Sequence, residues 1–419
     1  MRGSQGQSLR DRPRRVGAPR PWGGDSPKSN GRGRGSGDPE RGAWDLEDTE
    51  EAVDPATGPA GGSRVLHVVQ SGDRGGVQRH VRDVALGLAG GTAGVVVGQE
   101  GWLTAQLREA GIPVVLAPSL RRAVDPMASA RAAREVRQAA EATGATVVHA
   151  HGILALMACR HPGGRPLVYT PHGFQWRDPA HPPWLRAASR VVHRGLGPRL
   201  AALIAVSGSD AMDASLLGVP LERVHHVPNG VPPARRPEAP ARRFPPALGV
   251  ATRLVPGKGL EEAIRLLARL QGGVELHVAG TGPLEADLRR LALRAGVGTR
   301  VRWLGWQDDL EPFYRRIAVY VTLSRKEGLP YAVLDALAQG VPVLASDIPG
   351  HAEILAGGDA GFLVRRRAWE DAAARAHTWL HDTQAWQDAS RAARREALQR
   401  FALARMLQRL AALYAAQGG

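Results

Sequence analysis

Short apolar runs recur along the chain, separated by stretches with the apolar spacing of amphipathic helices. Such runs predict strands covered on both faces, because a strand of that kind needs apolar side chains at successive positions. In the first half the predicted strands are Val65–Val69, Val95–Gly98, Val114–Leu116, Val147–Ala150, Leu167–Thr170, Leu203–Ser207 and Val224–Val227. In the second half they are Leu248–Ala251, Val274–Ala279, Val301–Gly305, Val319–Leu323 and Val341–Ala345. This alternation is typical of doubly wound parallel α/β sheets.

The length and the composition divide the chain into segments. Its 419 residues suit two domains of about 170 residues with additional segments. Residues 1–62 are rich in Gly, Arg, Pro, Ser and Asp without apolar periodicity, which predicts a disordered tail. The tail is either a regulatory arm or the product of a misassigned start codon. Residues 232–246, rich in Pro and Arg, predict a linker between domains at 63–231 and 247–385.

The net charge narrows the classes of partner. Lys and Arg total 55 and Asp and Glu total 40, a balance of +15. Residues 1–62 carry ten charges of each sign, so the whole excess lies in the rest of the chain. Such an excess suits a nucleic acid, an anionic membrane surface or an acidic substrate. Because nucleic-acid-binding signatures are missing and aromatic residues are few, we expect no nucleic-acid partner.

Two helical segments carry arginines at helical spacing. They are Arg131, Arg134 and Arg137 on one segment, and Arg186, Arg190 and Arg194 on the other. Faces of this kind can rest on anionic lipid, although a solvated helix face has the same pattern.

The cysteine content and the length of the apolar runs indicate the cellular compartment in which the protein is expected. The single cysteine, Cys159, excludes an internal disulfide and fits a reducing environment. No apolar run reaches the roughly 18 residues of a membrane span, and the first residues lack a signal-peptide core. We therefore expect a cytoplasmic protein.

Two acidic residues lie in the stretch from Ser324 to Ile354, which reads as strand end, turn, helix and strand. Glu327 is in the turn, and Asp335 is on the helix that ends near Gly340. Carboxylates accept hydrogen bonds from vicinal hydroxyls, and the backbone N–H groups from Leu329 onward can hold a phosphate. Sugar hydroxyls, ribose hydroxyls and a diphosphate are what a nucleotide sugar offers. The alternative is a solvated turn residue and an ordinary helix-face residue.

A cationic pattern, R-L-V-P-G-K-G-L, follows the strand at Leu248–Ala251. Arg253 and Lys258 at the end of this strand would form a pocket for a diphosphate. Negative charge grows on the phosphate as a glycosidic bond breaks, so fixed cations there can replace a metal. The sequence has only three lysines, and Lys258 and Lys326 both lie in these patterns, which favours a need for ammonium groups. The alternative is two ordinary surface bases.

A glycine-rich turn follows the first predicted strand. Gly75 and Gly76 at the start of a helix let backbone amides approach an anion or an acceptor closely. The turn lacks the G-x-G-x-x-G pattern, so a dehydrogenase is disfavoured. A plain tight turn is the alternative.

Histidines end the next two strands of interest. His149 and His151 alternate on one strand, but no cysteine or acidic cluster accompanies them, so we expect no metal site. His172, in T-P-H-G, follows the strand Leu167–Thr170, and the carboxyl ends of such strands face a binding crevice. A structural histidine is the alternative for His172.

Taken in order, these patterns resemble those of the family 4 retaining glycosyltransferases. E-G-L-P followed by D-A-L-A-Q-G-V-P-V resembles the family's E-G-F-P and E-A-M-A-x-G-x-P-V, with Asp335 in place of the second glutamate. R-L-V-P-G-K-G resembles G-R-L-x-x-x-K-G, and V-P-N-G-V, A-G-T-G-P and V-R-W-L-G also match. The resemblance spans about Val65 to Tyr414. It implies the GT-B fold, two Rossmann-like domains facing across a cleft, with helices of 386–419 returning to the first domain.

The resemblance also implies roles for individual residues. The catalytic residues would be His172, Arg253, Lys258 and Glu327; the donor would be held by Gly75, Gly76, Gly328, Leu329 and Asp335; the base would contact the loop at Gly305 and Trp306. No acid is clearly placed as a covalent nucleophile, so we expect same-face attack, with the departing phosphate oxygen taking the acceptor proton.

The expected function is transfer of a hexosyl unit, with retention and without a metal or other cofactor. The donor would be a nucleotide sugar, most simply a UDP-sugar, and the acceptor a glycan, glycolipid or small molecule. The site of action would be the cytoplasm, on the inner face of the membrane, in polysaccharide or cell-envelope synthesis. Two alternatives remain: a binding protein that has lost activity, given Asp335, and a related sugar-nucleotide epimerase.

Overall fold

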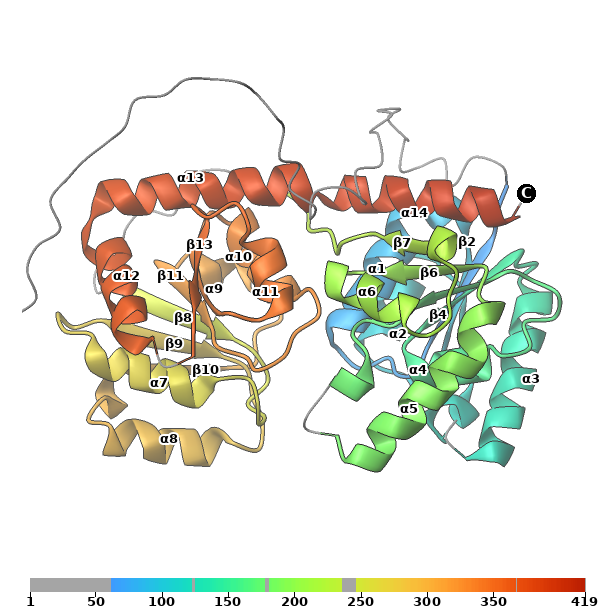
Figure 1. The fold of residues 1–419 in the computed structure, drawn as a ribbon, viewed down its shortest axis with the longest axis horizontal. Coiled ribbons are helices and arrows are strands. Elements are labelled where there is room, and N and C mark those ends of the chain that lie inside the picture. Colours follow the sequence, from blue (N-terminus) through green and yellow to red (C-terminus); the bar gives the residue numbers. More distant parts are fainter. Residues whose placement is uncertain (1–61, 123–124, 178–180, 236–245, 367, 419) are drawn as a thin grey trace, which may run out of the picture. The chain divides into compact units, whose positions relative to one another are not determined.

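The computed structural model describes residues 62–122, 125–177, 181–235, 246–366 and 368–418 (Figure 1). The predicted tail and most of the predicted linker therefore lie outside the described residues. The rest of the chain forms two parallel sheets, each built from alternating strands and helices.

The first sheet has the strand order β3-β2-β1-β4-β5-β6-β7. Its strands are β1 Val65–Val69, β2 Thr92–Val97, β3 Val114–Leu116, β4 Val147–His151, β5 Leu167–Thr170, β6 Ala202–Ala205 and β7 Val224–His226. The helices between them are α1 Gly76–Gly87, α2 Trp102–Glu109, α3 Pro126–Ala142, α4 Ile153–Ala158, α5 Pro183–Leu196 and α6 Gly208–Ser215. The strand order reverses between β1 and β4, and such a switch point opens a crevice at the carboxyl ends of the strands.

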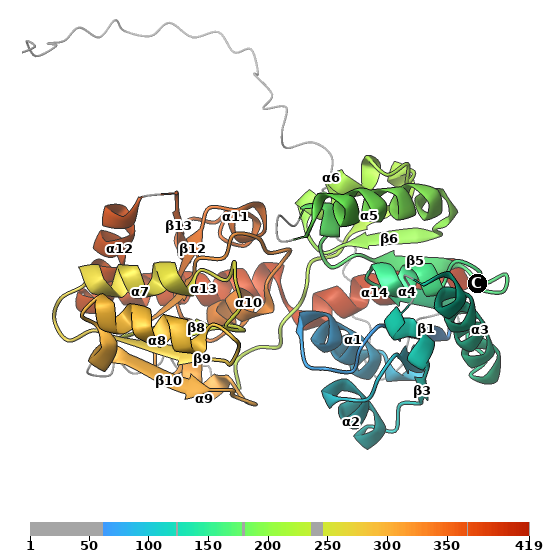
Figure 2. The same cartoon turned by 90° about the horizontal axis from the view of Figure 1, so that it is seen from below.

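The second sheet has the strand order β10-β9-β8-β11-β12-β13. Its strands are β8 Ala247–Ala251, β9 Glu275–Ala279, β10 Val301–Gly305, β11 Val319–Thr322, β12 Val343–Ser346 and β13 Gly361–Val364. Its helices are α7 Leu260–Arg269, α8 Glu285–Arg294, α9 Glu311–Tyr314, α10 Tyr331–Ala338, α11 Pro349–Ile354, α12 Trp369–His381 and α13 Thr383–Arg400. Figure 2 shows helices on both faces of each sheet. The order again reverses, between β8 and β11.

The expectation of doubly wound α/β sheets is confirmed. Each predicted strand is present, with boundaries moved by up to three residues, because continuous apolar runs mark strands that helices cover on both sides. The strand β13 was not predicted, since Gly361–Val364 is short and only half-buried along most of its length. The helix α10 ends where expected, and Gly340 follows it in the left-handed conformation, with φ of 73°.

The last helix, α14 Leu403–Gly418, packs on the first sheet. Its buried residues Met406, Leu407 and Leu410 share a core cluster with Val65 and Val147 on β1 and β4. The chain thus returns from the second sheet to close one face of the first. Within the described part of the chain, the helices all fall short of what crossing a membrane requires in length and apolar character.

Candidate active site

The loop after β8 carries Lys258 to an acidic partner. Gly257 and Gly259 have positive φ angles of 86° and 73°. A Cβ atom at Gly259 would lie 2.1 Å from the carbonyl oxygen of Leu323, so only glycine lets this loop pack against the loop after β11. As a result Lys258 Nζ donates a hydrogen bond to Glu327 Oε1 at 2.7 Å.

Arg253 lies on the same loop but takes no part in the hydrogen bond between Lys258 and Glu327. It lies two residues after the end of β8, and its side chain is exposed. The backbone around it is fixed by the G-T-G-P turn, since a Cβ atom at Gly280 would lie 2.0 Å from the carbonyl oxygen of Thr252. The structure therefore places both predicted cations at the carboxyl end of β8, with only Lys258 already held by Glu327.

His172 lies beside the loop that carries Glu327. Among the residues that the structure describes, it is the only non-glycine residue with a positive φ, 54°. Histidine tolerates this region better than most residues, but the conformation still costs on the order of 1 kcal/mol and marks a position held by its surroundings. A Cβ atom at Gly328 would lie 4.0 Å from the carbonyl carbon and oxygen of His172, and Lys326 Nζ donates to the carbonyl of Phe174 at 2.9 Å. The two loops, from different sheets, are thus in contact.

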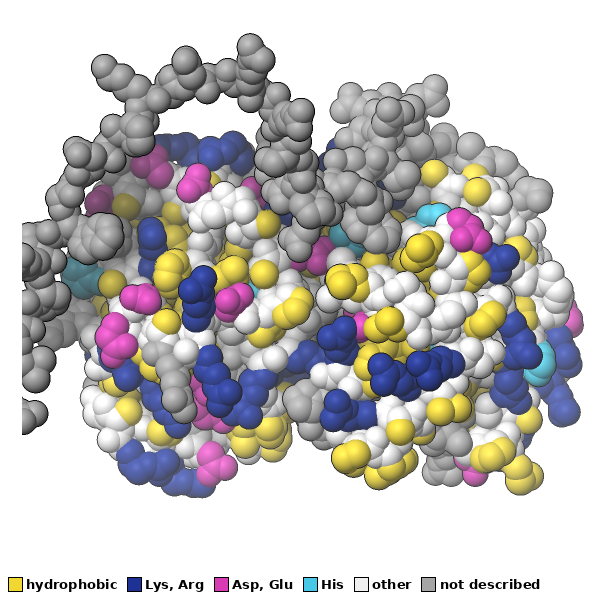
Figure 3. Space-filling view, in the orientation of Figure 1, with side chains coloured by type: hydrophobic (Ala, Val, Ile, Leu, Met, Phe, Trp, Pro, Cys, Tyr) yellow, Lys and Arg dark blue, Asp and Glu magenta, His cyan; other side chains and the backbone are white. Residues whose placement is uncertain are grey.

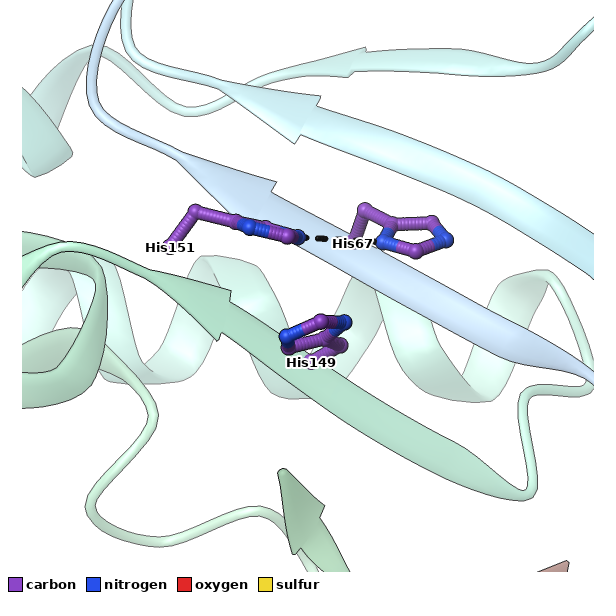
Figure 4. Close-up of side chains that lie close together, drawn as sticks. All are labelled: His67, His149 and His151. Atoms are coloured by element: carbon purple, nitrogen blue, oxygen red, sulfur yellow. Dashed lines mark hydrogen bonds between the residues drawn. The ribbon is translucent and has the colours of Figure 1, made fainter. Parts of the chain in front are cut away.

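Four more histidines cluster with His172, and none of the four was predicted as a site residue. The five are His67, His80, His149, His151 and His172. Two hydrogen bonds of 3.1 Å link three of them in a row: His67 Nδ1 to His151 Nε2, and His151 Nδ1 to His172 Nε2. Figure 4 shows the first of these bonds between neighbouring strands β1 and β4.

Burial keeps these imidazoles neutral. Loss of hydration lowers the pKa of His67 to about 3 and that of His80 to about 4. Burial and the neighbouring histidines also lower the pKa values of His149, His151 and His172 well below the usual value. Each ring therefore carries one N–H donor and one lone pair at neutral pH.

The flanking partners fix several of the rings. His149 Nδ1 lies 2.7 Å from the hydroxyl of Tyr414, and its Nε2 lies 2.8 Å from that of Thr170. His80 Nδ1 lies 3.1 Å from Asn229 Oδ1 and 3.3 Å from the Tyr331 hydroxyl. Through Tyr414, the helix α14 supplies a polar partner to His149 of the first sheet.

Asp335, the predicted ribose acceptor, is bound by Arg79 of α1. The guanidinium also lies 4.5 Å from the centre of the Tyr331 ring and 3.5 Å from the Asp83 carboxylate. Burial disfavours the charge of Arg79, but the Asp335 carboxylate outweighs this and raises its pKa above the usual range. A carboxylate has about four acceptor positions and Arg79 uses two, so acceptor capacity for a ribose remains.

The Gly-Gly loop and the expected base loop are also brought together. Gly75 is the N-cap of α1, and a Cβ atom at Gly76 would lie 3.8 Å from the Tyr331 ring. Arg74 Nη1 donates to Asp308 Oδ1 at 2.6 Å, and Trp306 Nε1 donates to the same oxygen at 3.1 Å. Gly305 has a positive φ of 66° and accepts a 2.7 Å hydrogen bond from the backbone N–H of Gly280.

Leu329 and its neighbours complete the site. Leu329 is buried, and its carbonyl accepts a 2.8 Å hydrogen bond from Asn229 Nδ2. Helix α10 begins two residues later, at Tyr331, and Pro330 is its N-cap. Gly328 leaves the approach between this loop and His172 free of a side chain.

Sequence patterns pointed to most of these positions, but not to Arg79, His80, His67, Asn229 or Tyr331. One signal was available for His67, because a polar residue within the apolar run V-L-H-V-V of a buried strand needs a partner. Arg79 had no such signal, since its partner Asp335 lies 256 positions away.

A pocket of about 680 Å³ lies elsewhere, at the amino-terminal ends of β5, β6 and β7. Its lining includes Arg160, Arg165, Arg199 and Arg223. These guanidinium groups donate mainly to nearby backbone carbonyl oxygens. The pocket does not include the residues predicted for the site, so we place the candidate active site at the carboxyl ends of the strands.

Both halves of the chain match known families. Residues 74–235 match the family model "Glycosyltransferase Family 4", and residues 236–396 match "Glycosyl transferases group 1". The lipopolysaccharide core biosynthesis glycosyltransferase LpsE of Rhizobium meliloti is 38% identical over 112 residues, 27% of this chain and 33% of that protein. The mannosyltransferase LpsB of the same organism is 30% identical over 215 residues, 45% of this chain and 60% of that protein. The chain thus spans less than two thirds of either relative.

The solved structure of HepE from Anabaena in complex with UDP and glucose has a similar fold. The TM-score is 0.71 at 22% sequence identity, over 83% of this chain and 98% of that chain. This likeness and the two parallel sheets confirm the expected two-domain GT-B fold.

Proposed function

Because this chain belongs to the family 4 glycosyltransferases, we propose that it transfers a hexosyl unit from a UDP-sugar with retention. The acceptor would be a glycan, a lipid-linked sugar or a small molecule. The relatives named for lipopolysaccharide core synthesis support a role in polysaccharide or cell-envelope assembly. HepE, solved with UDP and glucose, supports a uridine donor.

The observation that carries the proposal is the 2.7 Å hydrogen bond between Lys258 and Glu327. In a nucleotide sugar the hexose and the diphosphate are joined through one oxygen, so the groups that bind them must be neighbours. An ammonium has three donors, and Glu327 uses one of Lys258's, which leaves two for phosphate oxygens. Glu327 Oε2 remains for the hydroxyls of the sugar.

The same pair bears on the mechanism. In the proposed step the bond from the anomeric carbon to the donor phosphate breaks, and a bond to the acceptor oxygen forms on the same face of the sugar. The acceptor proton passes to the departing phosphate oxygen. Lys258 and Arg253 stabilise the negative charge that develops on the diphosphate, which is the role a metal has in other transferases.

The remaining residues position the donor. His172, held in its strained conformation beside Gly328, would contact the sugar. Asp335 would accept hydrogen bonds from the ribose hydroxyls at the two acceptor positions that Arg79 does not use. Backbone amides at Gly75 and Gly76 and near Leu329 would contact the phosphates, and the Trp306 loop the base. Closure of the site would exclude water, which would otherwise compete as acceptor.

Substitution of the two cations tests the proposal. Arg253→Ala and Lys258→Ala should each lower kcat by about 10²-fold or more, because each removes charge from the leaving group. Arg269→Ala is the matched control, since Arg269 is an exposed arginine at the end of the next helix, α7. Near-full turnover of both Ala variants would contradict the assignment.

Product analysis separates the alternatives. A thermal-shift screen against a panel of nucleotide sugars first identifies the donor. Incubation with that donor and candidate acceptors should then release the nucleoside diphosphate with a retained anomeric linkage in the product. Release of an epimerised sugar would favour the epimerase, and donor binding without turnover would favour the inactive binding protein.

We also propose that the protein works on the cytoplasmic face of a membrane. The arginines of α3 and α5 are exposed, and Figure 3 shows basic side chains gathered over α5. Trp184, at the start of α5, is 70% exposed and could insert into the lipid interface.

A further inference from the structure

Three histidine rings from separate elements face one another: His80 on α1, His151 at the end of β4 and His172 after β5. Their ring centroids are 4.8 Å (His80–His172), 5.6 Å (His80–His151) and 5.3 Å (His151–His172) apart. One ring nitrogen from each lies within 4.8 Å of the other two. Three imidazoles bound to a tetrahedral metal at about 2.1 Å have their nitrogens about 3.4 Å and their centroids about 5 Å apart. The ring positions therefore fit a metal, with movements of about 1 Å for the nitrogens.

The lone pair of His80 has no partner. Asn229 donates its amide N–H to Leu329, so its Oδ1 is an acceptor and His80 Nδ1 must carry the hydrogen. His80 Nε2 is then an acceptor, and this buried atom has no hydrogen-bond partner among the described residues. An unsatisfied buried acceptor costs about 1–3 kcal/mol, which a cation bound there would remove.

The second ligand is oriented in the same way. If His151 donates its Nε2 hydrogen to His67 Nδ1, at 3.1 Å, its Nδ1 carries a lone pair. His151 Nδ1 lies 3.1 Å from His172 Nε2, which then donates a hydrogen bond to it. A shift of the His172 hydrogen to Nδ1 would free both lone pairs. Ligating histidines commonly donate their other ring N–H to such a fixed partner, here Asn229 and His67.

We propose that His80, His151 and His172 form a binding site for a divalent transition metal of the zinc class. Imidazole nitrogens favour Zn²⁺, Co²⁺, Ni²⁺ and Cu²⁺ over Mg²⁺ or Ca²⁺. His80 and His151 are buried, while His172 is half-buried and offers a route of entry. Because the metal occupies Nε2 of His172, the site would be inhibitory for the transfer proposed above rather than a source of catalytic metal.

The other three-histidine group, His67, His149 and His151, fits less well. The centroids of His149 and His151 are only 4.0 Å apart, and both nitrogens of His149 already have hydroxyl partners. From the sequence, only His149 and His151 were visible as neighbours, and folding supplies His80 and His172.

Cobalt binding to the full chain, produced without a polyhistidine tag and stripped with a chelator, tests the site. We expect one Co²⁺ per chain with micromolar or tighter affinity, displaced by Zn²⁺, and visible absorption typical of four-coordinate Co²⁺. His80→Asn keeps an N–H near the position of Nδ1 but has no atom at Nε2, and His172→Asn tolerates the positive φ. Each should weaken binding by about 100-fold or more, because each removes one ligand.

A surface pair provides the control. His377 and His381 lie one turn apart on α12 with ring centroids 4.3 Å apart, so they too could chelate a metal. His377→Ala/His381→Ala should leave the high-affinity site intact. Absence of binding to the wild type, retention of binding in either folded Asn variant, or its loss in the α12 variant would each overturn the proposal. The assay needs neither donor nor acceptor, so its result is independent of whether the proposed transfer is correct.

Discussion

Arg79 donates two hydrogen bonds to Asp335, from Nη1 to Oδ2 at 2.5 Å and from Nη2 to Oδ1 at 2.8 Å. The pair joins the first helix of the first sheet to the helix of the second sheet that begins beside the proposed donor site. Its planar, two-point geometry suits a guanidinium and a carboxylate, and lysine could not reproduce it. The acid proposed to bind the ribose therefore also holds the two halves of the site together.

Removing the charge of Asp335 should lower both the stability of the protein and its affinity for the donor. Asp335→Asn should lower the free energy of unfolding by about 2 kcal/mol, because Arg79 is left with only the more distant Asp83. It should also raise the KM for the donor, by about 10-fold, because a ribose loses a charged acceptor. Urea denaturation and steady-state kinetics measure the two effects.

A double-mutant cycle with Arg79→Met serves as the control. If the pair acts as a unit, Arg79→Met/Asp335→Asn should be less destabilised than the sum of the single variants. Additive losses would mean that the two side chains stabilise the protein separately.

The pair also shows the limit of reasoning from sequence. Runs such as V-L-H-V-V and V-V-H-A-H predict the strands of the sheet, because a strand buried on both faces needs apolar residues at successive positions. Lys258 and Glu327 could each be singled out because their loops carry glycines and charges at family spacing, although their hydrogen bond to each other was not predicted. The sequence near Arg79 does not indicate that this residue pairs with Asp335, since an arginine on a helix usually faces solvent.

The histidine cluster illustrates the same point. His149, His151 and His172 end predicted strands, so their common edge followed from parallel topology. His80, by contrast, lies in the second turn of α1 among polar neighbours. It is bonded to Asn229 and Tyr331, which come from distant segments. Only the folded chain shows that it faces His151 and His172.

Glu327→Gln should test whether the Lys258–Glu327 pair acts as one unit in turnover. The amide keeps an acceptor oxygen but loses the charge that fixes the ammonium, so kcat/KM should fall by about 10²-fold. In the variant Lys258→Met/Glu327→Gln the loss should be little greater than in Lys258→Met alone, because residues that act together are not additive. Initial rates at saturating acceptor measure this, and fully multiplicative losses would contradict a shared role.

The buried histidines should make the protein sensitive to acid. Their folded pKa values lie below the unfolded value near 6.5, with His67 at about 3 and His80 at about 4. Below pH 6.5 the unfolded chain binds more protons than the folded one, so stability is full above this pH and falls as the pH falls. Each histidine contributes about 1.4 kcal/mol per pH unit. Asp210 changes the stability in the opposite direction and offsets about one histidine, because burial raises the pKa of this carboxyl to about 6.

Urea denaturation between pH 7.5 and pH 4.5 measures this dependence. The five histidines and His193, whose pKa burial lowers to about 4, outnumber Asp210 and Asp83, whose pKa values burial raises, so the free energy of unfolding should rise by several kcal/mol per pH unit near pH 5. His67→Asn, which removes one titrating ring, should reduce the slope by about 1.4 kcal/mol per unit. A stability that does not change over this range would show that the rings are protonated in the folded state.

The basic face of α5 should bind anionic membranes. Arg190 and Arg194 are exposed on this helix, and Trp184 and Val191 are each 70% exposed beside them. Each arginine near an anionic surface contributes about 1 kcal/mol, so Arg190→Gln/Arg194→Gln should weaken binding about 30-fold. Cosedimentation with phosphatidylglycerol-containing vesicles at low salt measures this, and added salt should weaken wild-type binding as screening increases.

Arg289 and Arg290 on α8 give a matched control for this face. Both are partly exposed arginines, but they pair with Glu285 and Asp287 on their own helix, which leaves little net charge for a lipid surface. Arg289→Gln/Arg290→Gln should therefore bind vesicles as the wild type does. Equal binding by the α5 variant and the wild type would show that α5 is an ordinary solvated face, because a charge-driven contact cannot survive the loss of two of its charges unchanged.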